Sequence, residues 1–281
     1  MNSPSVPHFP VLKKTSFVLP SITSGDLEVF LAKTPEDLLE VQKLHYRIFQ
    51  EEYGSHLADP EKFPPDPFDS VCDHLIVRDK KTEKIVGSYR LARRESAKIF
   101  GSFYTALEYD ISPLLDCRGE ILELSRSCVS LPYRGLPTMH LLWRGLAEYA
   151  LGHQIKFFFG CASFFGVDPQ KYAHAISYLY YSHLAPPAYC PRALEGHYVD
   201  MRLLKPEEVD VRKAVKEMPP LVKGYLRIGG FVGDGVFIDK EFNSTDVCIV
   251  VKTDLLTRRY ANYYNVRSTQ KNRFSDHEIE A

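Results

Sequence analysis

The fold of this chain is decided by the stretch Glu123-Leu-Ser-Arg126-Ser-Cys-Val-Ser-Leu-Pro-Tyr-Arg134-Gly135. It predicts a strand that carries an acid and a base, then a tight turn, and the residues after it predict a helix over 137–151. A helix N-terminus offers free backbone N–H groups and a partial positive charge, which together hold a phosphate. This strand–turn–helix unit therefore suits an enzyme that moves an acyl group from a phosphopantetheine carrier to an amine.

The spacing of the acid and the base on this strand predicts an irregularity. Glu123 and Arg126 are three residues apart, so on a flat strand their side chains point to opposite faces. A β-bulge between them would return both to one face and separate the strand from its neighbour, expected over residues 155–163. The slot that opens would free a backbone N–H to polarise a thioester carbonyl. The alternative interpretation is a salt-bridged pair at a sheet edge.

Composition excludes several classes of protein. The net charge is -1 and no long run of Lys or Arg occurs, so a nucleic-acid partner is not expected. The 6 cysteines lack CxxC pairs and the 10 histidines lack metal-ligand spacing, which indicates no metal site and a reducing compartment. No apolar run is long enough to span a membrane, and no secretory signal is evident. We therefore expect a cytoplasmic enzyme, with peripheral contact to the inner membrane left open.

The pattern along the chain predicts an α/β protein with a mixed central sheet flanked by helices. Residues 1–27 are expected to form an irregular arm, residues 28–267 one domain with an extended C-terminal part, and residues 268–281 a polar tail. A helix is predicted from Pro35 to near Gly54, with Thr34 as its N-cap. Further strands are predicted over 28–33, 74–79, 84–92, 120–129, 196–203 and 245–252, and further helices after Pro169 and over 206–217 and 220–228.

Several motifs in a fixed order connect the chain to a known family. They are Tyr46-Arg47-Ile48-Phe49-Gln-Glu51-Glu52, Asp66-Pro-Phe68-Asp69-Ser-Val-Cys72-Asp73-His74-Leu75, Gly87-Ser-Tyr-Arg90-Leu91, Glu123-Leu-Ser-Arg126-Ser-Cys-Val, Leu142-Trp143-Arg144-Gly145, Pro219-Pro-Leu-Val-Lys-Gly224-Tyr225-Leu-Arg227 and Phe242-Asn243-Ser-Thr-Asp246-Val247. With them the chain resembles the ornithine N-acyltransferases of bacterial ornithine-lipid synthesis, sometimes labelled hemolysin-like, within the GNAT superfamily. It is also distantly similar to the acyl-homoserine-lactone synthases.

The resemblance covers about Glu28 to Tyr264 and implies a GNAT-like fold. It implies transfer of a (3-hydroxy)acyl group from acyl carrier protein to the α-amine of L-ornithine, giving lyso-ornithine lipid. No bound cofactor is expected, and the carrier's phosphopantetheine thioester, or acyl-CoA, is the co-substrate. The usual GNAT coenzyme A loop is Arg-x-x-Gly-x-Gly, whereas here Pro137 and Met139 occupy its glycine positions. This departure favours a carrier-protein donor.

Candidate site residues follow from the resemblance and from residue chemistry. Phe49, Asp69, Arg90, Glu123 and Arg126 match positions that line the acceptor and reaction region of the lactone synthases. Glu123 is the first candidate for the base, directly or through water, with Asp69 or Asp73 second. The full expectation is catalysis by Glu123, Arg126 and Asp69; substrate binding by Arg47, Phe49, Asp66, Asp73 and Arg90; donor binding by Ser127, Val129, Arg134, Gly135 and Thr138; and carrier docking at Arg93, Arg94 and Lys98.

Two roles in this expectation rest on simple charge matching. A guanidinium fork suits a carboxylate, so Arg126 and Arg90 are expected to bind the carboxylate of the acceptor. The side-chain ammonium of ornithine needs a further acid, for which Asp66 or Asp73 is predicted. His45 stands where related families often carry an arginine, two residues before Arg47.

Two alternatives remain open at this point. One is an N-acyl amino acid synthase for another acceptor, such as glycine, lysine or tyrosine. The other is a non-catalytic lipid-binding, hemolysin-like protein, although such a protein has no need of a base beside a thioester slot. A thiol nucleophile at Cys161 is not expected, because that residue lies in an apolar strand, and a hydrolase is not expected because no G-x-S-x-G motif occurs.

Overall fold

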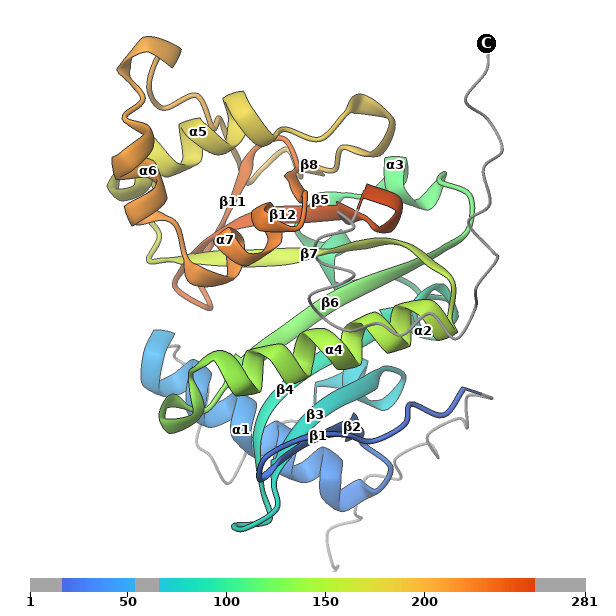
Figure 1. The fold of residues 1–281 in the computed structure, drawn as a ribbon. Coiled ribbons are helices and arrows are strands. Elements are labelled where there is room, and N and C mark those ends of the chain that lie inside the picture. The colour runs from blue at the N-terminus through green and yellow to red at the C-terminus, as the bar shows by residue number, and fades with distance from the viewer. Residues whose placement is uncertain (1–16, 54–65, 256–281) are drawn as a thin grey trace, which may run out of the picture.

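The computed structural model describes residues 17–53 and 66–255, which form a large mixed sheet covered by helices (Figure 1). The 10-stranded sheet has the order β1-β2-β3-β4-β6-β7-β12-β11-β9, with β10 also paired to β12. Neighbouring strands are antiparallel except for β6 and β7, which run parallel. The strands are β1 Ile22–Ser24, β2 Leu27–Leu31, β3 Asp73–Asp79, β4 Lys84–Arg93, β6 Glu120–Val129, β7 Ile155–Phe165, β9 Tyr198–Val199, β10 Phe231–Val232, β11 Val236–Asp239 and β12 Ser244–Lys252, and a separate pair is β5 Tyr109–Asp110 with β8 Arg192–Ala193.

Helices pack on both faces of the N-terminal half of the sheet. Side chains alternate along β3, so Leu75 and Val77 belong to the core beneath α4, whereas Ile76 belongs to the core beneath α1. The α-helices are α1 Pro35–Tyr53, α2 Arg94–Phe100, α3 Ser112–Leu115, α4 Leu136–Gly152, α5 Ala173–His183, α6 Val211–Glu217 and α7 Pro220–Arg227. None of the described helices has the length and apolarity needed to cross a bilayer.

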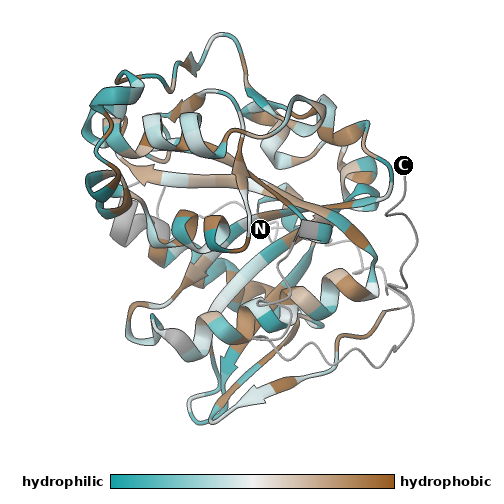
Figure 2. Ribbon diagram, turned by 45° about the horizontal axis from the view of Figure 1, so that its top comes forward, coloured by the Kyte–Doolittle hydropathy of each residue, from teal (hydrophilic) through white to brown (hydrophobic). Residues whose placement is uncertain are grey.

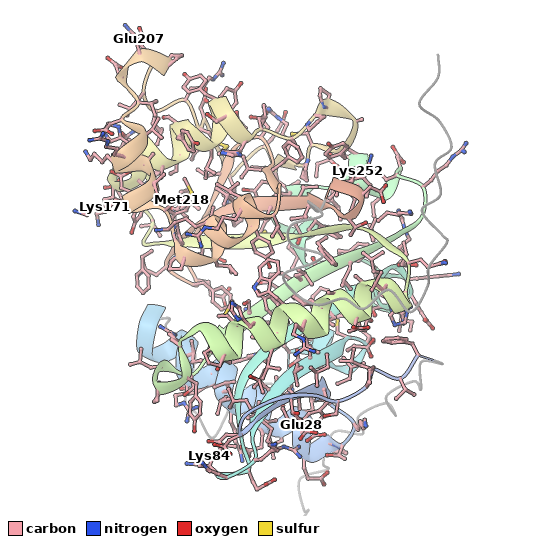
Figure 3. The ribbon with its side chains drawn as sticks, in the orientation of Figure 1. Glu28, Lys84, Lys171, Glu207, Met218 and Lys252 are labelled. Carbon is pink, nitrogen blue, oxygen red and sulfur yellow. The ribbon has the colours of Figure 1, made fainter. Side chains whose placement is uncertain are left out.

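Polar residues are distributed as expected for a protein with a buried sheet. Figure 2 shows hydrophobic residues along the strands and hydrophilic residues on the outer helices and turns. In the C-terminal half, Lys171 and Glu207 are exposed at the margin, whereas Met218 is buried between helices (Figure 3). The ring centroids of Trp143 on α4 and Tyr225 on α7 are 5.3 Å apart, so these two helices meet over the middle of the sheet.

The predicted start of α1 is confirmed in detail. The Thr34 hydroxyl accepts a hydrogen bond from the Asp37 N–H at 3.1 Å, and the Asp37 carboxylate accepts from the N–H groups of Lys33 and Thr34 at 3.0 and 3.3 Å. These bonds satisfy N–H groups that the first turn leaves without helical partners. Pro35 as the first helical residue needs no such partner.

Three local predictions need correction. The end of the predicted irregular arm contains β1, which pairs with β2 through a turn where Gly25 has a φ of 60°. The strand predicted over 196–203 is reduced to β9. The helix predicted over 206–217 is divided into a 3₁₀ turn, Pro206–Glu208, and α6, because Asp210 caps α6 by accepting from the N–H groups of Arg212 and Lys213. The predicted tail, 268–281, lies outside the described residues.

The centre of the sheet opens at the junction of β6 and β7. The two strands pair only from Glu120 to Glu123 on β6, opposite Ile155 to Phe159 on β7. On its other side β6 carries a bulge, because Arg90 pairs with Ser125 while Ser88 pairs with Cys128. The bulge that the sequence predicted is therefore present, and it falls at Arg126 and Ser127 rather than between Glu123 and Arg126. Arg126 has a φ of 50°, in the left-handed region.

Gly160 marks the point where β7 separates from β6. A Cβ atom at this position would lie 2.1 Å from the Leu124 carbonyl oxygen, so the backbones approach too closely for any side chain. The residue therefore sets the geometry of the opening.

We predict that Gly160→Ala destabilises the fold by about 1–3 kcal/mol, since the added methyl must push the two strands apart. Chemical denaturation followed by circular dichroism would measure this effect. Gly196→Ala is the matched control, because nothing lies within 4 Å of the Cβ position there. An equal, small change in both variants would contradict the importance of the close approach.

Candidate active site

A cavity of about 1520 Å³ occupies the space where β6 and β7 diverge. Its walls come from the bulged half of β6, the facing residues of β7, the first turns of α4, helix α7 and the β11–β12 turn. The lining includes Leu124 to Val129 on one side and Cys161 to Ser163 on the other. The cavity thus lies where the sequence predicted a slot.

The first turn of α4 borders one end of this cavity. Gly135 is the N-cap residue and provides no side-chain hydrogen bond, so the first N–H groups of this 17-residue helix have no cap from that residue. Arg134 precedes it and donates from Nε to the Val129 carbonyl at 3.0 Å. A helix N-terminus beside an arginine has the chemistry of a phosphate site.

Most of the predicted donor-binding residues line the cavity. Ser127, Val129, Arg134 and Gly135 are in its wall. Thr138 is not: its side chain is 2% exposed and packs against the backbone at Gly87. Its place on the first turn of α4 put it near the expected phosphate, but the helix turns its side chain to the sheet.

Arg126 extends from the bulge into the cavity wall. Its guanidinium lies 3.1 Å from Asp66 and stacks over the rings of Tyr104 and Phe242, at 5.1 and 4.9 Å from their centroids. Contacts on three sides fix the orientation of this cation. It therefore stands ready to bind an anionic group within the cavity.

A buried ion network supports the bulge from behind. Arg90 is 1% exposed and donates to Asp66 at 2.6 Å, to Asp69 at 3.0 Å and to the Ser125 hydroxyl at 2.9 Å. Burial opposes ionisation of Asp66, but the guanidiniums of Arg90 and Arg126 outweigh it and lower its pKa to about 2. Asp69 also accepts from Gln42 at 3.0 Å.

This network changes the expectation for three predicted site residues. Arg90, Asp66 and Asp69 bind one another, and none of them lines the cavity. Their roles are therefore best described as positioning the bulge and Arg126 rather than contacting a substrate.

Glu123, the predicted base, also lies behind the cavity wall. It is 1% exposed and accepts hydrogen bonds from the backbone N–H groups of Tyr104 at 3.1 Å and Thr105 at 2.5 Å. Burial raises the pKa of its carboxyl. Glu123 does not line the cavity, so its carboxyl has no direct contact with an amine bound there. Of the two predicted routes for the proton, the one through water remains. Its observed bonds hold the 3₁₀ turn η3, Tyr104–Leu107, against β6.

The structure does not bring the remaining predicted substrate residues to the cavity. Asp73 accepts a hydrogen bond from the Tyr149 hydroxyl at 2.6 Å, near the C-terminal end of α4. Arg47 is exposed on α1 and does not line the cavity. The side chain of Phe49 lies outside the described residues.

Two of the three predicted docking cations are used inside the fold. Arg94 donates to the carbonyl groups of Cys117 at 2.9 Å, Gly119 at 3.1 Å and Leu114 at 3.3 Å. Arg93 donates to the Tyr149 hydroxyl at 3.0 Å. Lys98 is exposed on α2. A docking surface at this place remains a prediction, with less free charge than the sequence indicated.

Sequence reasoning missed the acids that do line the cavity. Glu108, Asp239 and Asp246 each offer a carboxylate oxygen, and these three atoms lie within 4.8 Å of one another. Burial, followed by the neighbouring Asp246 charge, raises the pKa of Glu108 to about 8, and burial raises that of Asp246 to about 7. One signal was available: Asp246 directly precedes the apolar run Val247 to Val251, and a carboxylate is rarely buried unless it is paired.

Comparisons with known proteins point to one family of acyltransferases. The model of the acetyltransferase (GNAT) domain matches residues 44–144. An L-ornithine N(alpha)-acyltransferase of Brucella abortus is 40% identical over 256 residues, which cover 88% of this chain and 91% of that protein. Among solved structures, FeeM, an N-acyl amino acid synthase from uncultured soil microbes, is 7% identical with a TM-score of 0.47, covering 81% of this chain and 91% of that one. The acyl-homoserine lactone synthase BjaI is 15% identical with a TM-score of 0.46, covering 83% and 85%.

The divided sheet, the bulge and the cavity between β6 and β7 define a GNAT acyltransferase. The mixed-sheet fold expected from the sequence is thereby confirmed. At 40% identity over most of its length, the chain belongs to the family of L-ornithine Nα-acyltransferases.

We predict that Glu123→Gln lowers both stability and activity. A carboxylate accepts from two N–H groups, whereas the amide turns a donor toward one of them, which costs about 1–3 kcal/mol at a buried site. Thermal unfolding and turnover would be measured together, with exposed Glu207→Gln as the control. Loss of turnover at an unchanged melting temperature would instead favour a base that acts through water.

We predict that Asp246→Asn stabilises the fold at pH 8. The pKa of Asp246 is raised in the folded state, so between about pH 4 and about pH 7 this carboxyl ionises in the unfolded chain but stays protonated in the folded protein. Ionisation stabilises the unfolded chain, so the wild type loses stability over that window. Asn does not titrate, so the variant should be more stable by about 4 kcal/mol at pH 8, from about three pKa units at about 1.4 kcal/mol each, and the difference should shrink toward pH 4. Melting curves across pH would test this. A constant difference at all pH values would contradict it.

Proposed function

We propose that this protein transfers an acyl group from the thioester of acyl carrier protein to the α-amine of L-ornithine. The observation that carries the proposal is the identity of 40% over 88% of the chain with a protein named for that activity on ornithine. The cavity supports it, because the gap between β6 and β7, the N-terminus of α4 and Arg126 all border it.

The donor would lie in the slot between β6 and β7. Its phosphate would meet the N-terminus of α4 and Arg134, and its thioester carbonyl would lie along the bulged backbone near Leu124, where a backbone N–H polarises the carbonyl. Developing negative charge on the carbonyl oxygen is stabilised by a donor that is already fixed in place.

The acceptor would enter from the side of Arg126. Its carboxylate binds this guanidinium, and its α-ammonium loses a proton to water or a carboxylate before attack. The amine nitrogen then bonds to the carbonyl carbon, the carbon–sulfur bond breaks, and the leaving thiolate takes up a proton. No acyl-enzyme is formed in this direct transfer.

A carrier-protein donor fits the start of α4 better than free coenzyme A does. Pro137 stands in the first turn and has no backbone N–H, so the helix offers one donor fewer to a diphosphate. The phosphopantetheine of a carrier protein presents a single phosphodiester. Because carrier proteins are acidic, the exposed cations Arg134 and Arg227 at the cavity are the docking residues that we favour.

We expect the protein to act at the cytoplasmic side of the inner membrane. An N-acylated ornithine with a long chain is amphiphilic and partitions into a bilayer, so peripheral contact would help to release it.

The proposal predicts that purified protein, given 3-hydroxyacyl carrier protein and a pool of amino acids with ornithine, forms N-acylornithine as the main product. Mass spectrometry of the products would measure it, with 3-hydroxyacyl-CoA as the comparison donor. Arg126→Gln should raise the KM for ornithine at least about tenfold, because a charged hydrogen bond to the carboxylate is lost. Acylation of a different amino acid would move the acceptor, and an intact thioester would favour a binding protein.

A further inference from the structure

Three carboxylates from separate parts of the chain converge on one wall of the cavity. Glu108 follows η3, Asp239 ends β11, and Asp246 lies within β12. Oxygens of all three lie within 4.8 Å of one another. We refer to Glu108, Asp239 and Asp246 as the carboxylate cluster.

Two buried oxygens of the carboxylate cluster lack a hydrogen-bond donor among the described residues. Glu108 is 6% exposed and Asp246 4% exposed, yet Oε2 of the first and Oδ1 of the second accept no hydrogen bond within the described part of the chain. Buried polar atoms in folded proteins nearly always have a partner, so these two oxygens point to a ligand. Both residues also line the cavity.

The charge of the cluster is not neutralised by the protein. Across residues 17–53 and 66–255, no Lys or Arg nitrogen forms an ion pair within 4.0 Å of any of the three carboxylates. Arg126 forms no ion pair with Glu108, but its positive charge partly offsets the rise in the pKa of that carboxyl. Both residues line the same cavity. Like charges this close favour binding of a cation or a shared proton.

Hydrogen bonds from neighbouring groups hold two members of the carboxylate cluster. Asp246 Oδ2 accepts from the Ser244 hydroxyl at 3.1 Å, and Asp239 Oδ1 accepts from the N–H groups of Glu241 and Phe242 at 2.8 and 2.9 Å. These bonds fix the carboxylates of Asp239 and Asp246 in place. A primary ammonium has three N–H donors, which match three converging acceptors.

We propose that the carboxylate cluster binds the side-chain ammonium of the acceptor and so selects a diamino acid. The inference rests on the proposed function, in which Arg126 holds the carboxylate of the same molecule. In ornithine the α-amine is on the carbon that bears the carboxylate, so an acceptor anchored at both ends would hold its α-amine near Arg126, within the cavity. The cluster takes the role that sequence reasoning gave to Asp66 or Asp73, which the structure places elsewhere.

The test compares ornithine with norvaline, which has the same carbon chain without the side-chain amine. The full-length protein, the variants Asp246→Asn and Asp239→Asn, and the control Asp254→Asn, at an exposed position just after β12, would be assayed with 3-hydroxyacyl carrier protein. Wild type should prefer ornithine by about 100-fold or more in kcat/KM, since a site built for a polar group rejects an analogue without it. Each cluster variant should lower that preference at least about tenfold, because kcat/KM falls more for ornithine than for norvaline. The control should keep the preference.

Calorimetry provides a second measurement that does not depend on turnover. Wild type should bind ornithine more tightly than norvaline, and Asp246→Asn should remove this difference while the melting curve shows a folded protein. If either cluster variant fails to fold, the other still decides the matter, because both positions contribute to the same site.

Three results would overturn the inference. Equal losses for ornithine and norvaline would assign the cluster to the reaction or to the fold. Loss of activity with a chelator, restored by Mg²⁺, would assign it to a divalent cation. Unchanged preference in both variants would place the ammonium elsewhere. The proposed function fails separately, if wild type forms no N-acylornithine from the carrier thioester at all.

Discussion

The contact between the Gly160 backbone and the Leu124 carbonyl is the constraint on which the rest of the structure depends. At this point two strands that began as a parallel pair stop pairing, and each continues with a different partner. A residue with a side chain would force them apart earlier and in another direction. The position of the cavity, the start of α4 beside it and the distance across it all follow from where this separation occurs.

The bulge on β6 needs support, and the buried network of Arg90, Asp66 and Asp69 supplies it. Burying a guanidinium is unfavourable unless its donors are satisfied, and here two carboxylates and a hydroxyl satisfy most of them. The network also places Arg126, since Asp66 binds both guanidiniums. Residues that the sequence indicated as substrate contacts thus act one layer behind the cavity, where they hold the residues that do line it.

Sequence patterns predicted the regular parts of the fold well. The Thr34 cap, the hairpin of β3 and β4, and the unit from β6 through α4 to β7 follow from local chemistry and periodicity, which a sequence carries directly. The bulge was predicted from the spacing of Glu123 and Arg126, although it falls at Arg126 and Ser127. The short strand β9 depends on β11, a partner distant in the chain, so no local pattern reports it.

The candidate site was harder to predict, for a physical reason. Donor-side residues lie on one continuous segment, so Ser127, Val129, Arg134 and Gly135 could be named together. The carboxylate cluster joins Glu108 to two aspartates more than a hundred positions later in the chain. The pairing of β11 with β12 brings the aspartates together, and Tyr109, which donates to the Asp246 carbonyl at 2.9 Å, holds Glu108 beside them. The orientation of Glu123, inward to η3 rather than to the cavity, depends on one backbone turn that leaves no mark in the sequence.

The short pairing between β6 and β7 has a mechanical consequence. Two halves of the sheet are joined along four residues of β6, and beyond them the strand edges face an open gap. An acyl donor with amide groups that entered this gap would form hydrogen bonds with the exposed strand edges. Binding of the donor would then couple the two halves, and the protein would gain rigidity and resistance to unfolding in proportion to donor occupancy.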